Sequence, residues 1–430
     1  MRIGLLALAL STLAGCAATT PHMIPTPVAY KHPSLDLVPV LPPDLRSTEV
    51  PVFYATTREP VTAGAPGHYR DAQGDGVRLG VARVRLGEPG WTWDQLVASD
   101  STDTLNNPRP GRVESVREFG MLGTEGDSAA ERAFIEQIDE RIARSNNKEL
   151  VFYVHGYRVF FDEVTVMMGS WSHYLGHGAI ATFQWPTGQN FWNYLTDCPR
   201  AERYVPDIER TVALLAKSRA SHINIIAYSC GSPLLGQALA RLRARHPNEN
   251  PEQLARRYRI ANVIFAASDV DLKTFASELA PPIMDLSRQT IIYASRNDAA
   301  LGFSSLIAAT SRLGRPDIKE LSVAELERLA TDPRFQVIDV SDVRGAHEMG
   351  GMRGHGYWFA NNWISTDVAL ALRYPIAPAK RCLVTAVKRN VWKFPDAYPD
   401  CIAERLIAAY PQLRRSTPRV GLERESDQKK

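Results

Sequence analysis

The sequence lacks the features that mark metal proteins and nucleic-acid-binding proteins. It has five cysteines and ten histidines in 430 residues, and no group of them has zinc-ligand spacing. The net charge is only +3, which leaves no electrostatic footprint for nucleic acid. We therefore expect no metal, no other cofactor and no nucleic-acid partner. The remaining composition, 44% hydrophobic and 23% charged, is typical of a globular protein.

The N-terminus predicts export. The apolar run 3–10 is too short to cross a bilayer, which takes about 20 residues, and favours a signal peptide over residues 1–15. Leu13-Ala14-Gly15-Cys16 looks like a bacterial lipobox, in which Cys16 carries lipid after cleavage. This predicts a lipid anchor in the cell envelope, at the periplasmic face of the outer membrane. Residues 16–48, rich in Pro, Thr and Ala, are predicted to form an extended tether without a core of its own.

Strands alternate with helices along the centre of the chain. The apolar run 150–154 is typical of a parallel strand buried on both faces. Further strands are predicted at 50–58, 77–86, 179–185, 221–226, 261–267, 290–294 and 335–340, a Gly-rich loop at 64–76, a loop at 186–199, and helices at 127–144, 162–175, 201–219, 234–245 and 365–372. This order predicts one α/β domain over residues 49–375, with a doubly wound, mostly parallel sheet and helices on both faces.

The strand at 221–226 leads into Ala227-Tyr228-Ser229-Cys230-Gly231, a small-x-Ser-x-Gly pattern before a predicted helix. An ordinary turn also has Ser-x-Gly, but strand, turn and helix together favour a nucleophile elbow, in which strained backbone lifts Ser229 above the sheet. A serine hydroxyl is a poor nucleophile, so it needs a base and an acid that orients the base.

In this architecture the partners follow the serine as acid and then histidine. We predict His355 as the base, in a glycine-rich loop before the aromatic run 357–359, with His347 as the alternative. His246 falls at the far end of the elbow helix. His155 follows an early strand and is interpreted as a structural residue.

The predicted acid is Asp298, a few residues beyond the strand at 290–294. Asp269 and Asp271, after the preceding strand, are the alternatives. A purely structural interpretation is that Asp298 caps the helix that follows it. For the oxyanion hole the candidates are the backbone N–H groups of Cys230, at the start of the elbow helix, and Tyr157, after His155-Gly156.

The remaining cysteines are assigned by position. Cys382 and Cys401 are the candidate disulfide, because they bracket a weakly periodic stretch inside the C-terminal extension 376–430. Two free thiols are the alternative. Cys198 is left without a partner, and the basic end of the extension is predicted to be disordered.

Three segments resemble one known family. Residues 52–58, 154–157 and 226–231 are similar to α/β-hydrolase proteins of the DUF900 type, and the resemblance covers residues 50–375. It implies the α/β-hydrolase fold and an esterase-like or lipase-like activity. Members usually have His-Gly-Tyr-Asn and Ala-His-Ser-Met-Gly, where this chain has Arg158, Tyr228 and Cys230. Arg158 places a cation near the oxyanion loop, where it favours anionic substrates or faces solvent.

The leading hypothesis is a serine ester hydrolase that acts on a small-molecule or lipid ester at the envelope. The alternatives are a non-catalytic lipoprotein of the same fold that binds a partner, and an amidase or thioesterase that shares the acyl-enzyme mechanism. An aromatic cluster is expected either to overhang the site and bind acyl chains or to pack in the core: Phe183, Trp185, Phe191, Trp192 and Tyr194.

Overall fold

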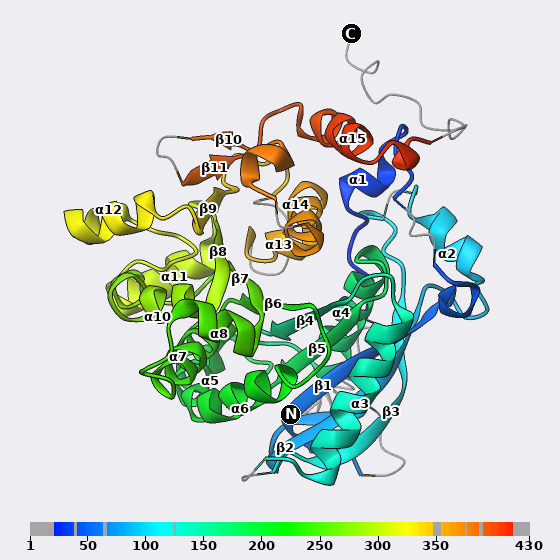
Figure 1. Ribbon diagram of the computed structural model, residues 1–430, viewed down its shortest axis with the longest axis horizontal. Helices are drawn as coiled ribbons and strands as arrows, with labels where there is room; N and C mark the ends of the chain where they lie inside the picture. The colour runs from blue at the N-terminus through cyan, green and yellow to red at the C-terminus, as the bar shows by residue number, and fades with distance from the viewer. Residues whose placement is uncertain are drawn as a thin grey trace, which may run out of the picture.

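Eleven strands of the described residues form one sheet in the computed structural model (Figure 1). The structure describes residues 21–37, 41–62, 67–102, 104–123, 126–346, 354–374, 376–386 and 390–415. The strand order is β10-β11-β9-β8-β7-β6-β4-β5-β1-β2-β3. The bounds are β1 Glu49–Pro60, β2 Tyr69–Leu86, β3 Gly111–Met121, β4 Glu149–Val154, β5 Ala179–Gln184, β6 His222–Tyr228, β7 Ile260–Ala266, β8 Ser287–Ala294, β9 Phe335–Asp339, β10 Val384–Thr385 and β11 Val391–Lys393.

The centre of the sheet is parallel from β11 through β9, β8, β7, β6, β4 and β5 to β1. Antiparallel β2 and β3 extend one edge, and antiparallel β10 ends the other. The central strands are short and apolar because both of their faces are covered. Leu150, Phe152 and Val154 of β4 face one core, while Val151 and Tyr153 face the other. The predicted doubly wound α/β fold is confirmed.

Helices cover the two faces of the sheet (Figure 1). One core includes buried side chains of α3, α6, α7, α8 and α10, and the other includes side chains of α1, α4, α14 and α15. The helices are α1 Val28–Lys31, α2 Trp93–Ser99, α3 Ala129–Arg144, α4 Phe161–Tyr174, α5 Tyr194–Arg200, α6 Val205–Leu215, α7 Gly231–Ala244, α8 Pro251–Tyr258, α9 Leu272–Thr274, α10 Ala280–Leu286, α11 Ala299–Ala308, α12 Val323–Thr331, α13 Tyr357–Ala360, α14 Asn362–Arg373 and α15 Tyr398–Ala409.

Several elements differ from their prediction. Strand β2 begins at Tyr69, inside the segment predicted as a Gly-rich loop, because its partner β1 extends to Pro60 and pairs with it. The edge strand β3 carries polar side chains on its outer face and was not predicted. Helix α5 lies in the predicted loop 186–199. Short polar segments of this kind are stabilised by their neighbours more than by their own periodicity.

The N-terminal segment is packed on the domain, so the prediction of an extended tether is wrong for residues 21–37. Met23, Ile24, Tyr30 and Leu35 are buried with the core that α4, α14 and α15 form. The backbone N–H of Met23 donates to the Arg109 carbonyl at 2.8 Å. A proline-rich segment forms few hydrogen bonds of its own, but here its apolar side chains cover the helices. We call residues 21–25 the N-terminal strap.

The C-terminal extension joins the same sheet, so the predicted boundary at 375/376 does not separate it from the domain. It supplies β10, β11 and α15. A disulfide joins Cys382 to Cys401, with Cα atoms 6.0 Å apart. Fully buried Arg381 donates from Nε to Asp367 Oδ1 of α14 at 2.7 Å, and the Tyr293 hydroxyl of β8 donates to Asp367 Oδ2 at 2.7 Å. This ion pair ties the extension to the sheet.

The basic tail beyond residue 415, residues 1–20 with Cys16, and His347 all lie outside the described residues. Across the described ranges, no helix has both the length and the apolar character needed to cross a membrane.

Replacing Arg381 by Met is expected to lower the free energy of unfolding by about 3–5 kcal/mol, since it leaves the Asp367 carboxylate buried without its cation. The matched control is Arg144→Met, which removes a largely exposed pair with Asp44 and is expected to change the free energy of unfolding much less, because water screens an exposed pair. Urea unfolding of the oxidised protein measures both. Equal losses for the two variants would contradict this assignment.

Candidate active site

Ser229 occupies the turn between β6 and α7. Its backbone has φ 52°, in the left-handed region that non-glycine residues rarely adopt. The turn is held from β7, because the Ser229 N–H donates to the Ala266 carbonyl at 3.1 Å. The side chain is buried against the sheet but lines a pocket. This is the backbone geometry that the small-x-Ser-x-Gly pattern predicted.

Two glycines let this turn contact the turn after β4. A Cβ on Gly231 would lie 2.3 Å from the His155 carbonyl oxygen and 2.8 Å from that of Val154. A Cβ on Gly156 would lie 2.8 Å from the Cβ of Ser229. Real Cβ atoms do not approach this closely, so only glycine fits at either position. The contact brings both candidate oxyanion donors to one place.

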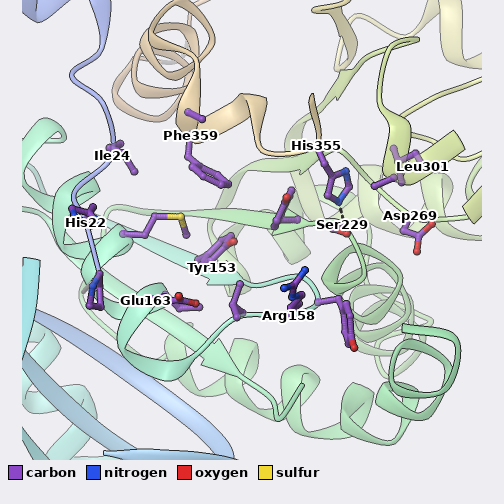
Figure 2. Close-up of a pocket in the computed structure, with 18 of the residues that line it drawn as sticks. His22, Ile24, Tyr153, Arg158, Glu163, Ser229, Asp269, Leu301, His355 and Phe359 are labelled. Atoms are coloured by element: carbon purple, nitrogen blue, oxygen red, sulfur yellow. Dashed lines mark hydrogen bonds between the residues drawn. The ribbon is translucent and has the colours of Figure 1, made fainter. Parts of the chain in front are cut away.

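Figure 2 shows the imidazole of His355 pointing toward Ser229. The ring is hydrogen-bonded to Ser229 on one side and to Asp298 on the other. Its Nε2 is 2.8 Å from Ser229 Oγ, and its Nδ1 is 2.8 Å from Asp298 Oδ2. An ionised carboxylate only accepts hydrogen bonds, so Nδ1 carries the proton and Nε2 is free to accept the serine proton. Asp298 is fully buried and His355 nearly so. The three residues predicted from their order in the sequence are therefore linked by two hydrogen bonds, both of them to His355.

Asp298 also caps α11, because its Oδ1 accepts from the Leu301 N–H at 3.0 Å. The two interpretations of this residue are therefore compatible: one oxygen caps the helix and the other bonds to His355. The cap fixes the direction of the carboxylate.

The aromatic run after His355 fastens its loop. The Tyr357 hydroxyl donates to the Tyr293 carbonyl at 2.7 Å and accepts from the Ala267 N–H at 2.9 Å. The Tyr228 ring packs on the imidazole with centroids 5.1 Å apart. Burial raises the pKa of Tyr228 well above its usual value, so this neighbour stays neutral. These contacts hold the ring of His355 in one orientation.

The alternative acids have other partners. Asp269 lines the pocket, but its Oδ1 accepts from Ser304 Oγ at 2.6 Å and its Oδ2 accepts from the Tyr194 hydroxyl. Asp271 caps α9, with its Oδ1 2.8 Å from the Thr274 N–H. Neither carboxylate contacts His355.

Cys230 directly follows Ser229 in the turn after β6, and Tyr157 directly follows Gly156 in the turn after β4. Cys230 is the N-cap residue of α7, where the helix dipole favours negative charge. Within the described residues, the backbone N–H groups of Cys230 and Tyr157 have no hydrogen-bond acceptor. Two such donors beside a serine hydroxyl suit an oxygen that gains charge during reaction.

A disulfide joins Cys230 to Cys198, with Cα atoms 5.8 Å apart, which corrects the expectation that Cys198 has no partner. It links α5 to the elbow. The two cysteines are 32 residues apart in sequence, and cysteine positions alone do not determine connectivity.

His155 supports the β4 turn from below. Its Nδ1 donates to the Gly156 carbonyl at 2.6 Å, and its Nε2 accepts from the Trp185 N–H at 3.0 Å. Burial, with a smaller effect of Arg58, lowers the pKa of His155 to about 3. The ring stays neutral near pH 7 and keeps this pair of bonds, in the structural position expected for it.

A family model described as "Alpha/beta hydrolase of unknown function (DUF900)" matches residues 130–371, more than half of the chain. The chain belongs to this family. No curated protein matches it.

Two solved structures of esterase B from Lactobacillus rhamnosis are similar to it. The C6-C4 SN3 inhibited form is 11% identical, with 53% of this chain and 77% of that chain covered and a TM-score of 0.28. The other is 10% identical, with 63% and 81% covered and a TM-score of 0.28. A likeness of this size says nothing about the chemistry of this DUF900 protein.

The pocket above Ser229 has a volume of about 640 Å³ and mostly apolar walls (Figure 2). Its lining comes from the N-terminal strap, the β4 turn, α4, α11 and the His355 loop. Representative lining residues are Ile24, Tyr153, Arg158, Met167, Leu301 and Phe359. The sequence did not predict that the N-terminal strap lines this pocket, because the composition of the strap does not indicate which surface it packs against.

The predicted aromatic cluster divides between core and surface. Phe183 and Trp185 are fully buried in the core, and Trp192 is exposed. Tyr194 lines the pocket, and the side chain of Phe191 lies outside the described set. Within the described ranges, no group of three or more His, Cys, Asp or Glu residues is arranged to hold a metal ion.

Gly231→Ala tests the contact between the two turns. Its Cβ would meet backbone carbonyls that cannot move aside alone, so we expect Ser229 to react at least about 100-fold more slowly with a fluorophosphonate probe. The control is Gly236→Ala on the same helix, whose Cβ would meet only the flexible end of Leu279 at 3.0 Å. Equal labelling rates for the two folded variants would rule out a role for this contact.

Proposed function

We propose that this protein is a serine-dependent ester hydrolase that works through an acyl-enzyme intermediate. The observation that carries the proposal is the hydrogen-bonded series Ser229, His355 and Asp298 at the wall of a mostly apolar pocket. Membership of an α/β-hydrolase family supports the same class of activity.

In the proposed mechanism Ser229 Oγ attacks the ester carbonyl and His355 Nε2 takes its proton. Asp298 stabilises the imidazolium that forms. The N–H groups of Tyr157 and Cys230 bind the oxyanion of the tetrahedral intermediate. Its collapse breaks the bond to the alkoxide, which leaves with the proton from His355. A water molecule then hydrolyses the acyl-enzyme by the same steps, which restores Ser229 and releases the acid.

The apolar walls favour an ester over a peptide, because an apolar pocket leaves the polar groups of a peptide backbone without partners. Amide and thioester bonds can be hydrolysed by the same mechanism. The kcat/KM values of an ester, a thioester and an amide that carry the same butyryl group rank the three kinds of bond. We expect the ester and thioester to be hydrolysed and the amide to be the slowest.

Variants of the three residues test the mechanism. Ser229→Ala is expected to abolish fluorophosphonate labelling and to lower kcat by at least about 10⁴-fold; Asp298→Asn, which keeps an oxygen for the α11 cap, should lower kcat by about 10²–10⁴-fold. His355→Ala is expected to resemble Ser229→Ala. The controls are Asp269→Asn and His347→Ala, each expected within about tenfold of wild type. A folded wild-type protein that neither labels nor hydrolyses any of these esters would instead be a non-catalytic lipoprotein.

We propose that Cys16 carries a lipid that anchors the protein in the bacterial cell envelope, at the periplasmic face of the outer membrane. The lipobox Leu13-Ala14-Gly15-Cys16 supports this. The position of Pro21 at the pocket also supports it, since a lipid five residues away would hold the pocket beside its membrane.

Cys16→Ser is expected to abolish incorporation of labelled palmitate and to move the protein from the membrane fraction to the soluble fraction. Ser229→Ala is the control and is expected to stay with the membrane. Wild-type protein without incorporated palmitate would contradict the anchor and leave the hydrolase proposal unaffected.

A further inference from the structure

Arg158 is an exposed cation on the wall of the pocket, two residues after Gly156. It lines the same pocket as Ser229 and His355. Figure 2 shows its guanidinium group turned toward the interior of the pocket. The backbone N–H of Tyr157 is one of the two proposed oxyanion donors. Arg158 is the next residue, so its side chain begins one residue along the chain from that donor.

The acidic residues of this pocket already have other partners. Asp269 accepts from Ser304 and lies 3.3 Å from the Arg312 Nε. Glu163 accepts from the Phe160 N–H at 2.9 Å through its Oε2. The Arg158 side chain forms no hydrogen bond or ion pair with the other described residues. Among the described residues, the Arg158 guanidinium therefore has no carboxylate partner in the pocket.

Nearby Arg58 shows the contrast. It is fully buried, forms an ion pair with Asp71, and donates to the Val159 carbonyl at 2.8 Å. Burial lowers the pKa of Arg58, and the charges of Asp71 and Glu163 oppose that shift. Arg58 thus has structural partners for its charge, whereas Arg158 has none among the described residues.

The backbone of Arg158 is also strained. Its φ of 60° lies in the left-handed region, which costs about 1 kcal/mol for a residue other than Gly, Asn or Asp. Among the described residues, the Arg158 side chain forms no pair that would offset this cost. Strain at a pocket residue is a reason to look for function there.

We propose that Arg158 binds an anionic group of the substrate, so that the preferred esters carry a carboxylate or phosphate a few bonds from the carbonyl. This deepens the proposed function and rests on it. Guanidinium pairs with either anion through two parallel hydrogen bonds. The rest of the pocket would hold the uncharged part of the ester.

Two matched pairs of esters test the charge and its source. The 4-methylumbelliferyl monoester of glutaric acid is compared with 4-methylumbelliferyl pentanoate, in which a methyl group replaces the acyl-side carboxylate. The second pair, 1-butyrylglycerol 3-phosphate and 1-butyrylglycerol, places a phosphate on the alcohol side. We expect wild type to prefer the anionic member of at least one pair by tenfold or more in kcat/KM, and that pair identifies the anion.

Arg158→Gln is expected to lower kcat/KM for the preferred anionic ester at least tenfold more than for its neutral partner, mainly through KM. Arg158→Lys should restore part of the preference. Arg158→Asn, which suits the left-handed backbone, is expected to raise the melting temperature while it removes the preference. The matched control is Arg144→Gln, a largely exposed arginine far from the pocket in sequence.

The proposal is overturned if wild type shows no preference in either pair, or if Arg158→Gln lowers all four rates by the same factor. Failure of the hydrolase proposal would give a different result, because wild type would then react neither with the neutral esters nor with the fluorophosphonate probe.

Discussion

The contact between the turns after β4 and β6 is the constraint on which the candidate site depends. At Gly156 and Gly231 the backbones approach more closely than any side chain allows. This approach brings the turn that carries Tyr157 against the turn that carries Ser229 and Cys230. The same contact buries His155, whose ring is neutral and forms two hydrogen bonds. A charged ring there would need water, which the contact excludes.

Asp298 joins the site to the packing of the domain. One carboxylate oxygen caps α11 and the other meets His355. The helix that it caps supplies Leu301 to the pocket wall. The position of the acid and the shape of the pocket therefore depend on the same helix end, and a change in α11 would affect both.

The sequence was most informative where chain order and periodicity act together. Apolar strands with glycine-flanked turns predicted the parallel sheet, and the order of Ser229, Asp298 and His355 predicted three residues that the structure brings into contact. The partner of Cys198, the edge strand β3 and the packing of residues 21–37 were not predicted. Each depends on contacts between segments that are distant in sequence, and local patterns contain no record of those contacts.

The N-terminal strap limits how far the candidate site can lie from the proposed lipid anchor. A chain spans at most about 3.5 Å per residue, so the five steps from Cys16 to Pro21 allow about 17 Å from the proposed lipid to the rim of the pocket. A long tether would let the domain sweep through the periplasm. With the proposed lipid on Cys16, a strap that is itself part of the pocket wall would confine the site to a thin layer above one leaflet, where encounters with substrate would depend on diffusion within the plane of the membrane.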